Sequence, residues 1–480
     1  MMPARTGEQF LKGLRGLREV WVDGERISDV VDHPKLRGAA HALAEVFDLH
    51  HKHPDILLMP DEETGEPIPV SHMIPRSRED LLRRGKALRR VAEYSVGLMG
   101  RTPDYMNVTY AGFAGNRGEW ANHGNEAGAE RLVAYQKFLR RNDISLTHTI
   151  VQPTVDKTMG DAPQAGNPYA LRKVGETEHG IVVRGARILA TLAPFADEIA
   201  VYPALPLPAG ADDYALSFCI PMGAPGLKFL CRDSASASPD RFDHPLSSRF
   251  DEQDAFVIFD DVEIPRDRLF IDCNLAAYNS VMATSWPPNI QQQTMIRASV
   301  KLDFAWGLAL RVAAAINATD PETMRMIGEI WSYAEFTRSA VIAAETEARE
   351  WPGGLWTPAV GPLHALRGTL PLWFPRVNEI LRLIGSHNVF ATPTAAQMAD
   401  KDLRPLIDRY LPGAKGMAAE ERIRIFRLAW DFAGSALASR NEQYERFYLA
   451  SSPRNLARHL VFTDRSRADR LVDRFLKEPY

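Results

Sequence analysis

Cysteine is scarce in this chain. Only Cys219, Cys231 and Cys273 occur among its 480 residues, and no two of them are spaced as in a CxxC motif. Three such cysteines are too few for the disulfide framework of a small secreted protein, and they provide no pair of metal ligands at a typical spacing. We therefore expect a cytoplasmic protein without a metal site.

The chain also lacks an apolar run long enough to span a bilayer, and its first residues contain no apolar signal core. Its 57 basic and 61 acidic residues nearly cancel, to a net charge of −4. This balance gives no electrostatic footprint for nucleic acid or for an anionic membrane. We expect neither kind of partner.

Three common nucleotide-binding or nucleophile motifs are missing as well. There is no GxGxxG after a predicted strand, no Walker A loop and no GxSxG elbow. Rossmann dehydrogenases, P-loop enzymes and α/β-hydrolases are therefore disfavoured. What the chain does have is 45% hydrophobic residues, which is typical of a globular protein with a large core.

Hydrophobic periodicity divides the chain into a helical, a strand-rich and a second helical part. The first 150 residues show helical patterns near 34–49, 77–99 and 126–141, with a capping box at Thr6–Gln9 and a tight hairpin turn at Asp23-Gly24. The mainly α, α+β chain is thus expected to have a helical domain at 1–145, a β-domain at 146–272 and a helical bundle with a tail at 273–480.

Strand signals fill the middle part. The two β-branched runs of Gly180–Leu189, separated by Arg184-Gly185, predict a hairpin, and Tyr214–Ile220, Leu227–Cys231 and Ala255–Ile264 predict further short strands. After about residue 275, apolar residues return at an i, i+4 spacing, as in the row that runs from Val300 to Ile316. These stripes suit the core of a helix bundle.

Residues Gly100–Tyr105 form the most informative segment. Thr102 followed by Pro103 predicts a helix that begins with an N-cap and a proline in its first turn, where Asp104 suits the helix dipole. Arg101 lies just before this cap and Tyr105 just after it. A permanent cation and a phenol can thus converge on an anion or a polarised oxygen, although a capped surface helix would have the same pattern.

His148 lies between Thr147 and Thr149, next to an irregular Gln-Pro-Thr stretch. Histidine is a natural acid or base near neutral pH, but a single histidine is more often structural. His50, His51 and His53 resemble a metal-binding sequence. No further ligands accompany them, so a solvated helix end is the better interpretation. Asp260-Asp261 is expected to be a pair of solvent-facing turn acids.

Taken together, these segments resemble the oxygenase component of two-component flavin-dependent phenol monooxygenases, the 4-hydroxyphenylacetate 3-monooxygenase family. The resemblance covers nearly the whole chain. The matching segments are, in chain order, Thr6–Leu11, Val22–Glu25, Gly100–Asn107, Leu146–Thr149, Gly185–Thr191, His244–Glu252, Ala391–Thr394, Phe426–Asp431 and Tyr444–Phe447.

The resemblance implies an acyl-CoA dehydrogenase-like architecture: a helical N-terminal domain, a middle β-barrel domain and a C-terminal four-helix bundle. It implies that a separate NAD(P)H-dependent reductase supplies FADH2, with FMNH2 as the alternative, and that O2 adds to form a C4a-hydroperoxyflavin. A phenol, such as 4-hydroxyphenylacetate, would then be hydroxylated ortho to its hydroxyl group. The family also implies a homotetramer built as a dimer of dimers.

Site residues follow from the same resemblance. Arg101, Tyr105 and His148 are implied as the catalytic and substrate-binding groups, with His148 as base or phenolate partner. The implied flavin contacts are His148, Thr149, Thr154, Val155, Asp156, Lys157, Thr191, Phe447, Tyr448, Leu449, Ala450 and Ser451.

The chain departs from the family pattern in two places. Where relatives have Gly-Asp-Pro after the C-terminal aromatics, this chain has Ala450-Ser-Ser-Pro453. Where the phenylacetate enzymes hold the substrate carboxylate with a Ser-Thr pair, this chain has an apolar loop containing Pro203, Ala204 and Leu205. This loop favours a neutral or bulkier phenol.

Three other functions compete with a monooxygenase. A 4-hydroxybutyryl-CoA dehydratase type needs an iron–sulfur cluster held by three cysteines and one histidine, but the Arg101–Tyr105 segment contains no cysteine. An acyl-CoA dehydrogenase-like oxidase needs a catalytic carboxylate, which the Arg, Tyr and His set does not provide. A non-catalytic flavin carrier would not need that set at all.

Overall fold

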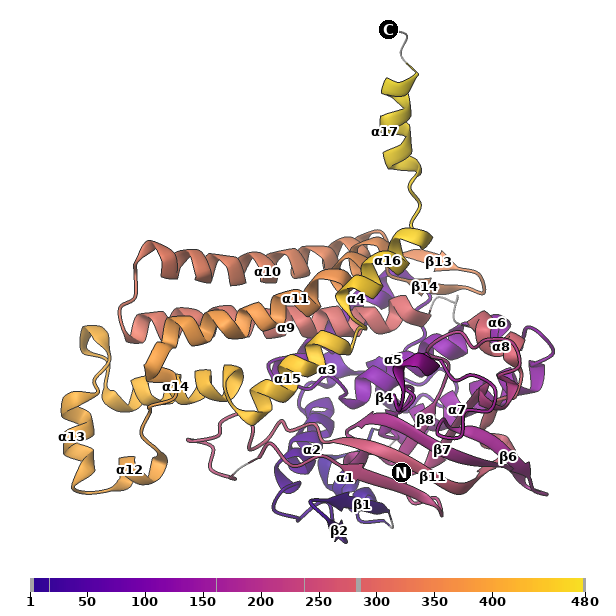
Figure 1. The fold of residues 1–480 in the computed structure, drawn as a ribbon, viewed down its shortest axis with the longest axis horizontal. Coiled ribbons are helices and arrows are strands. Elements are labelled where there is room, and N and C mark those ends of the chain that lie inside the picture. Colours follow the sequence, from indigo (N-terminus) through magenta and orange to yellow (C-terminus); the bar gives the residue numbers. More distant parts are fainter. Residues whose placement is uncertain (1–3, 17, 161, 237, 282–285, 478–480) are drawn as a thin grey trace.

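The computed structural model describes residues 4–16, 18–160, 162–236, 238–281 and 286–477. Helices dominate both ends of the chain, and the strands gather between them in the sequence and in space (Figure 1). None of the described helices combines the length and the apolar character that a bilayer crossing demands.

The helical patterns near 34–49, 77–99 and 126–141 each correspond to a helix, although the second helix ends at Tyr94 and not near residue 99. Further, shorter helices lie between them. The N-terminal helices are α1 (Gly7–Leu14), α2 (Arg37–Lys52), α3 (Pro54–Leu57), α4 (Arg78–Tyr94), α5 (Pro103–Gly115), α6 (Arg117–Ala121) and α7 (Glu126–Asn142). The capping box before α1 is present, because the Thr6 hydroxyl accepts from Gln9 N and the Gln9 side chain accepts from Thr6 N. Two short strands, β3 (Leu58–Pro60) and β4 (Pro67–Pro69), pair between α3 and α4.

The middle part contains two sheets. The larger has the order β2 (Glu25–Ile27), β1 (Glu19–Val22), β10 (Leu227–Cys231), β11 (Asp254–Pro265), β7 (Gly180–Thr191), β6 (Arg172–Glu176), and the smaller β12 (Leu269–Asp272), β9 (Leu216–Pro221), β8 (Glu198–Val201), β5 (Leu146–His148). Neither sheet closes on itself in the described residues, so the expected barrel is replaced by two open sheets. Phe218 of β9 meets Phe259 of β11 edge to face, and both sheets share one hydrophobic core.

One predicted turn in this region is wrong and one is confirmed. Arg184-Gly185 does not turn a hairpin: β7 continues through it as one 12-residue strand, paired along its length with β11. Gly185 instead has φ 130°, and a Cβ there would lie 2.4 Å from the Ala170 carbonyl oxygen, so the glycine permits a close backbone approach. The Asp23-Gly24 turn between β1 and β2 is present, with both residues at positive φ.

The C-terminal part is a bundle of long helices. Figure 1 shows α9, α10 and α11 side by side, with α14 and α15 beside them and α17 projecting from the body. Its helices are α8 (Leu275–Ser280), α9 (Trp286–Ala315), α10 (Pro321–Thr346), α11 (Val360–Gly385), α12 (Ala395–Ala399), α13 (Leu403–Tyr410), α14 (Ala419–Ala433), α15 (Ala436–Phe447), α16 (Ser452–Phe462) and α17 (Ser466–Leu476). A two-stranded ribbon, β13 (Arg349–Trp351) and β14 (Leu355–Thr357), joins α10 to α11.

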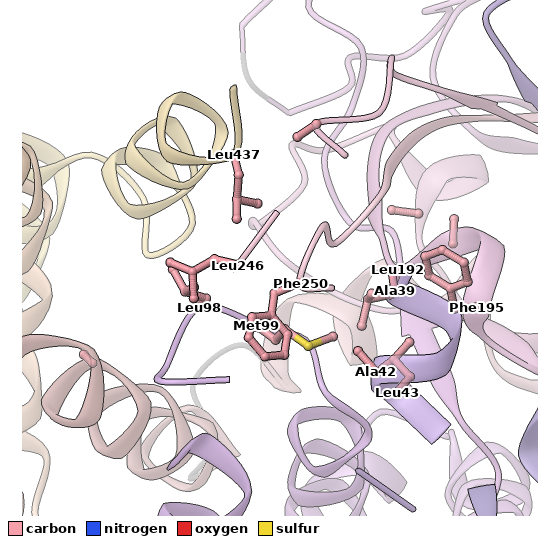
Figure 2. Close-up of a cluster of buried hydrophobic side chains, with 14 of the residues drawn as sticks. Ala39, Ala42, Leu43, Leu98, Met99, Leu192, Phe195, Leu246, Phe250 and Leu437 are labelled. Atoms are coloured by element: carbon pink, nitrogen blue, oxygen red, sulfur yellow. The ribbon is translucent and has the colours of Figure 1, made fainter. Parts of the chain in front are cut away.

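The core is continuous where the three parts meet. Figure 2 shows Leu98 and Met99 among side chains of all three: Leu43 of α2, Phe250 of the β-region and Leu437 of α15. Both Leu98 and Met99 are 1% exposed. Because these residues directly precede Gly100 and Arg101, the segment with the strongest functional pattern is fixed at the junction of the three parts.

Candidate functional site

Helix α5 begins as the sequence predicts. Thr102 has extended N-cap backbone angles, Pro103 is the first helical residue, and the Tyr105 N–H bonds the Thr102 carbonyl at 3.0 Å. The Thr102 hydroxyl, however, accepts no bond from the helix backbone. Asp104 is 6% exposed and accepts a hydrogen bond from Gln293 of α9 at 3.2 Å, and burial raises the pKa of this carboxyl to about 6.

Arg101 lies in a cage of tyrosines. Its guanidinium carbon is 3.9 Å from the ring centre of Tyr105, 4.6 Å from that of Tyr448 and 5.6 Å from that of Tyr444. Its backbone N–H donates to Glu252 Oε1 at 2.7 Å. The Nη1 atom is buried and has no hydrogen-bond partner among the described residues, so it can donate to a bound molecule.

His148 completes this cluster. It ends β5, which pairs in parallel with β8, and its ring stacks on Tyr105 with 5.5 Å between centres and an 18° angle between planes. The ring of Tyr202, the residue directly after β8, also packs against the His148 ring, with 5.4 Å between their centres. Burial and then the positive charge of Arg101 hold the pKa of His148 well below its ordinary value, so the imidazole is neutral at physiological pH.

The two threonines implied as flavin contacts lie close to His148 in the sheets. Thr149 N–H bonds the Ala200 carbonyl at 2.9 Å, and the buried Thr149 hydroxyl has no partner among the described residues. Thr191 ends β7. Its carbonyl accepts from the Thr147 hydroxyl at 2.5 Å, and its own hydroxyl donates to Asp254 Oδ1 at 2.8 Å.

A buried charge network connects Thr191 with Arg101. Arg440 of α15 donates from Nε and Nη2 to the Asp254 carboxylate at 2.8 and 2.7 Å, and from Nη1 to Glu252 Oε2 at 3.0 Å. Glu252 in turn accepts the Arg101 backbone N–H. Although burial alone would raise the pKa of Asp254, the charge of Arg440 lowers it to about 2. Arg440 thus binds both Glu252, which accepts the Arg101 backbone N–H, and Asp254, which accepts the Thr191 hydroxyl.

The C-terminal segment is only partly at this site. Tyr448 stacks on Tyr444 at 4.7 Å, and its buried hydroxyl lacks a partner among the described residues. Leu449 is buried, Ala450 has φ 67°, and Ser451 is the N-cap of α16. Phe447 is 58% exposed, on the outward side of α15.

Residues Thr154, Val155, Asp156 and Lys157 lie apart from the cluster. All four are exposed, and Asp156 accepts the Thr158 N–H at 2.8 Å to cap a 3-10 turn over Lys157–Met159. No described contact joins them to Arg101, Tyr105 or His148.

The loop with Pro203, Ala204 and Leu205 follows directly after Tyr202. Pro203 is buried, whereas Ala204 and Leu205 are half-buried. Asn279 of α8 fixes the next turn, because its side chain accepts from Leu207 N at 2.8 Å and donates to Leu207 O at 2.9 Å. The loop is therefore anchored at both ends, with apolar side chains between.

Sequence reasoning missed Tyr202, Tyr444, Glu252, Asp254 and Arg440. Three of them left a signal: Tyr202 directly precedes the apolar loop, Glu252 ends the matching segment His244–Glu252, and Tyr444 begins the matching segment Tyr444–Phe447. Burial, and then the interaction with Tyr105, raise the pKa of Tyr202. The others lie far apart in the chain, and only the fold brings them together.

Among the described residues, neither the Asp260-Asp261 pair nor the tract of His50, His51 and His53 forms a second functional site. Asp260 and Asp261 are exposed and ion-paired with Lys228 and Arg184, as expected of surface acids. His50, however, is buried rather than solvated, because α2 turns it into the core beside Phe47. Within the described residues, no group of three or more His, Cys, Asp or Glu side chains is arranged to hold a metal.

Two family models match almost the entire chain. The one described as 4-hydroxyphenylacetate 3-hydroxylase N terminal matches residues 6–271, and the one described as 4-hydroxyphenylacetate 3-hydroxylase C terminal matches residues 279–477. The 4-hydroxyphenylacetate 3-monooxygenase oxygenase component of Thermus thermophilus is 37% identical, over 94% of this chain and 93% of that protein. The 4-nitrophenol 2-monooxygenase oxygenase component of a Rhodococcus species is 31% identical, over 92% and 85%.

Solved structures agree. The oxygenase component (HpaB) of 4-hydroxyphenylacetate 3-monooxygenase complexed with FAD superposes with a TM-score of 0.93 at 34% identity, covering 99% of this chain and 98% of that chain. The same holds for its complex with FAD and 4-hydroxyphenylacetate. An archaeal 4-hydroxybutyryl-CoA dehydratase from N. maritimus shares the fold, with a TM-score of 0.85 at 20% identity over 95% and 91%.

Proposed function

Because this chain belongs to the 4-hydroxyphenylacetate 3-hydroxylase family, we propose that it is the oxygenase component of a two-component flavin-dependent monooxygenase. Its reaction would hydroxylate a phenol ortho to the existing hydroxyl group, giving a catechol. The dehydratase alternative is not supported, because that likeness is one of fold at 20% identity and the Arg101–Tyr105 segment contains no cysteine.

The observation that carries this proposal is the buried Arg101 guanidinium beside Tyr105 and His148. Its Nη1 atom has no hydrogen-bond partner among the described residues. A phenol becomes a better nucleophile as its hydroxyl proton is removed or polarised. With a reference pKa near 10, the phenolate lies roughly 4 kcal/mol above the phenol at pH 7. Each hydrogen bond from a charged group offsets about 1.5–3 kcal/mol of that difference, so Arg101 with one or two further donors would offset most of it.

We assign the roles as follows. Arg101 stabilises the negative charge on the phenolic oxygen, and Tyr105 donates a hydrogen bond to the same oxygen. His148 is neutral and a weak base because its pKa is lowered. It therefore acts as a hydrogen-bonding partner that accepts the phenol proton only as Arg101 stabilises the phenolate.

FAD fits the residues present. Three buried polar groups at this junction, the Thr149 hydroxyl, the Tyr448 hydroxyl and Arg101 Nη1, have no partner among the described residues, as expected where a polar ligand binds. We propose that Thr149, Thr191 and the Tyr448–Ser451 segment hold the flavin, with Thr154–Lys157 at its outer end. Bound reduced FAD would supply the activated oxygen, and a separate NAD(P)H-dependent reductase would supply reduced FAD.

The substrate proposed is a para-substituted phenol without a carboxylate close to the ring. The loop of Pro203, Ala204 and Leu205 offers no side-chain hydroxyl to bind a carboxylate. Relatives are named for both kinds of phenol: one that is 31% identical is named for 4-nitrophenol, which has no carboxylate, and one that is 37% identical is named for 4-hydroxyphenylacetate. For assembly we propose a homotetramer, a dimer of dimers, which light scattering would test as four times the 53.6 kDa chain mass.

The decisive experiment loads the purified protein anaerobically with photoreduced FAD and mixes it with oxygenated buffer, with and without a panel of phenols. We expect one class of phenol to yield close to one catechol per FAD oxidised, with little hydrogen peroxide. Immediate oxidation of FAD to give peroxide with every phenol would contradict the proposed function. 4-Hydroxyphenylacetate and 4-nitrophenol in the same panel compare a charged with an uncharged para substituent.

A further inference from the structure

Asp104 is a buried carboxyl group at the edge of the candidate site. It is the second residue of α5, it lies between Arg101 and Tyr105 in the chain, and it is 6% exposed. Its Oδ2 atom accepts a hydrogen bond from Gln293 Nε2 of α9 at 3.2 Å. Its Oδ1 atom is buried and has no hydrogen-bond partner among the described residues. The carboxyl group thus joins the start of α5 to the first turns of α9.

No cation of the described residues is ion-paired with Asp104. The titratable side chains buried on α5 and on the elements packed against it are Tyr105 and Tyr110 of α5, His72 of the 3-10 turn Val70–His72, Tyr135 and Arg140 of α7, His148 of β5, and Arg297 and Lys301 of α9. The cations among them have other partners: Arg297 and Lys301 pair with Glu445, and Arg140 pairs with Asp61. A carboxylate at Asp104 therefore has hydrogen-bonding neighbours but no counter-charge.

The same part of α9 also supports the tyrosine cage of Arg101. One turn after Gln293, the Arg297 guanidinium carbon lies 5.3 Å from the ring centre of Tyr448 and 5.9 Å from that of Tyr444. The guanidinium carbon of Arg101 lies 4.6 and 5.6 Å from the same two ring centres. Both tyrosines therefore contact one arginine next to α5 and one on α9. A shift of α5 relative to α9 would change the surroundings of Arg101.

The ionised form of Asp104 is costly for the fold. Burial raises the pKa of this carboxyl group from an ordinary 3.8 to about 6. A raised folded-state pKa gives stability that is fully present below pH 3.8 and is lost as pH rises through 6. At pH 7.5 the charge therefore destabilises the protein, and a neutral side chain of the same shape would avoid this cost. A titratable group in such an environment beside a reaction site is a candidate for a functional role.

We propose that Asp104 is a positioning residue for the hydroxylation: its carboxylate fixes the start of α5 on α9 through Gln293. This contact keeps Arg101 and Tyr105 in the arrangement that the reaction needs. The inference rests on the proposed function. The charge matters because a carboxylate accepts a stronger hydrogen bond than a neutral amide or acid does. Its loss affects how much of the oxidised FAD yields catechol, rather than the fold.

Asp104→Asn tests this role, because it keeps the shape of the side chain and removes its charge. In the assay with photoreduced FAD, we expect the ratio of catechol to hydrogen peroxide at pH 7.5 to fall about tenfold, the difference between a charged and a neutral hydrogen bond. As the pH is lowered to 5 and the wild-type carboxylate is protonated, the difference between the two proteins should shrink to less than about twofold. Urea unfolding at pH 7.5 should show the variant to be at least as stable as the wild type.

Asp143→Asn is the matched control. Asp143 is also buried, burial raises its pKa to about 6, and it accepts from Arg5 N at 3.0 Å at the end of α7. Its variant should have the wild-type ratio of catechol to peroxide at every pH. Gln293→Met removes the donor to Asp104 by a second route. It should reproduce the loss at pH 7.5, and the double variant with Asp104→Asn should show no further loss.

A wild-type ratio at pH 7.5 in either Asp104→Asn or Gln293→Met would overturn the proposal. So would a loss in Asp104→Asn that stays the same from pH 7.5 to 5, because packing alone would then explain it. Should Asp104→Asn fail to fold, the ratio in Gln293→Met decides the outcome. If the wild type gave no catechol with any phenol, the proposed function would fail together with this role, so the two failures are distinguishable.

Discussion

Single residues at the candidate site combine an expected chemistry with an environment that only the structure reveals. Arg101, Tyr105 and His148 are 47 positions apart at most, and the fold stacks the two rings at 5.5 Å with the guanidinium 3.9 Å from one of them. The sequence predicted the residue types. It did not predict that burial lowers the pKa of His148 or that Tyr202 would join the group.

His148→Ala tests the role of the imidazole. We expect coupled hydroxylation to fall about 100-fold or more, because a positioned acid–base group contributes about 10²–10⁴-fold. FAD affinity should stay largely intact, since Thr149, Thr191 and Tyr448 remain. Catechol yield per FAD oxidised is the measurement, with His179→Ala, an exposed histidine, as the control. An unchanged catechol yield in His148→Ala would show that the role assigned to the ring is wrong.

Tyr202→Phe tests a residue that the sequence did not reveal. The change keeps the ring that packs on His148 but removes the hydroxyl that interacts with Tyr105. We expect catechol yield to fall and peroxide to rise, by about tenfold in their ratio, which corresponds to one hydrogen bond. Tyr214→Phe is the matched control, because Tyr214 is also buried and donates to Asn167 O away from the site. Equal ratios in the two variants would remove Tyr202 from the site.

At the scale of elements, three segments that are distant in the sequence depend on one another. The end of β7, the start of β11 and the middle of α15 meet in the network of Thr191, Asp254 and Arg440, which continues through Glu252 to Arg101. Each carboxylate is stabilised by the same guanidinium. We therefore expect that removing this guanidinium displaces the end of β7, the start of β11 and the start of α5 together.

Arg440→Gln should expose this dependence. Glu252 would lose its ion-pair partner and Asp254 would keep only Arg232, at 3.0 Å, so we expect the free energy of unfolding to fall by about 3–5 kcal/mol and catechol yield to fall with it. Arg440→Lys should recover part of both, since the charge remains but the paired hydrogen bonds do not. Urea unfolding measures stability, and Arg446→Gln on the same helix, an exposed arginine paired with Glu442, is the control. A similar small effect of both Gln variants would contradict the network.

The whole molecule is held together by buried charge as well as by its continuous apolar core. Glu445 of α15 accepts from Arg297 at 2.7 and 2.9 Å and from Lys301 at 3.0 Å, both on α9. Arg297 also donates to Gly97 O at 2.7 Å, next to the segment that leads to Arg101. The ion-pair group thus ties the bundle to the N-terminal helices.

This group predicts a pH dependence of stability. Burial alone would raise the pKa of Glu445, but Arg297 and Lys301 lower it from an ordinary 4.5 to about 2. A lowered folded-state pKa gives stability that is present above pH 4.5 and is lost as pH falls towards 2. The shift corresponds to about 3 kcal/mol.

Unfolding free energies measured between pH 6 and the acid limit test this expectation. The wild type should lose about 3 kcal/mol more over the acid range than Glu445→Gln, which has no carboxyl to titrate there. Glu62→Gln, an exposed acid, should follow the wild type. If Glu445→Gln had the same pH profile as the wild type, the ion-pair group would not be the source of the acid sensitivity.

The sequence by itself determined most element types, the capping box at Thr6–Gln9, the start of α5 and the family. Capping boxes, proline-initiated helices and i, i+4 stripes are local patterns, so Thr6–Gln9 and the start of α5 were predictable from neighbouring residues. The family followed from ordered motifs, and the matches over residues 6–271 and 279–477 confirm it. The assigned flavin and substrate contacts stay predictions.

Only the tertiary structure decided the path of β7 through Arg184-Gly185, the two open sheets and the network around Arg440. A glycine after β-branched residues is equally typical of a turn and of a close backbone approach, and the partner strand decides between them. Contacts between β11 and α15 join residues that are 186 positions apart. No local pattern encodes such a pairing, because its stability arises from burial that exists only after the chain has folded.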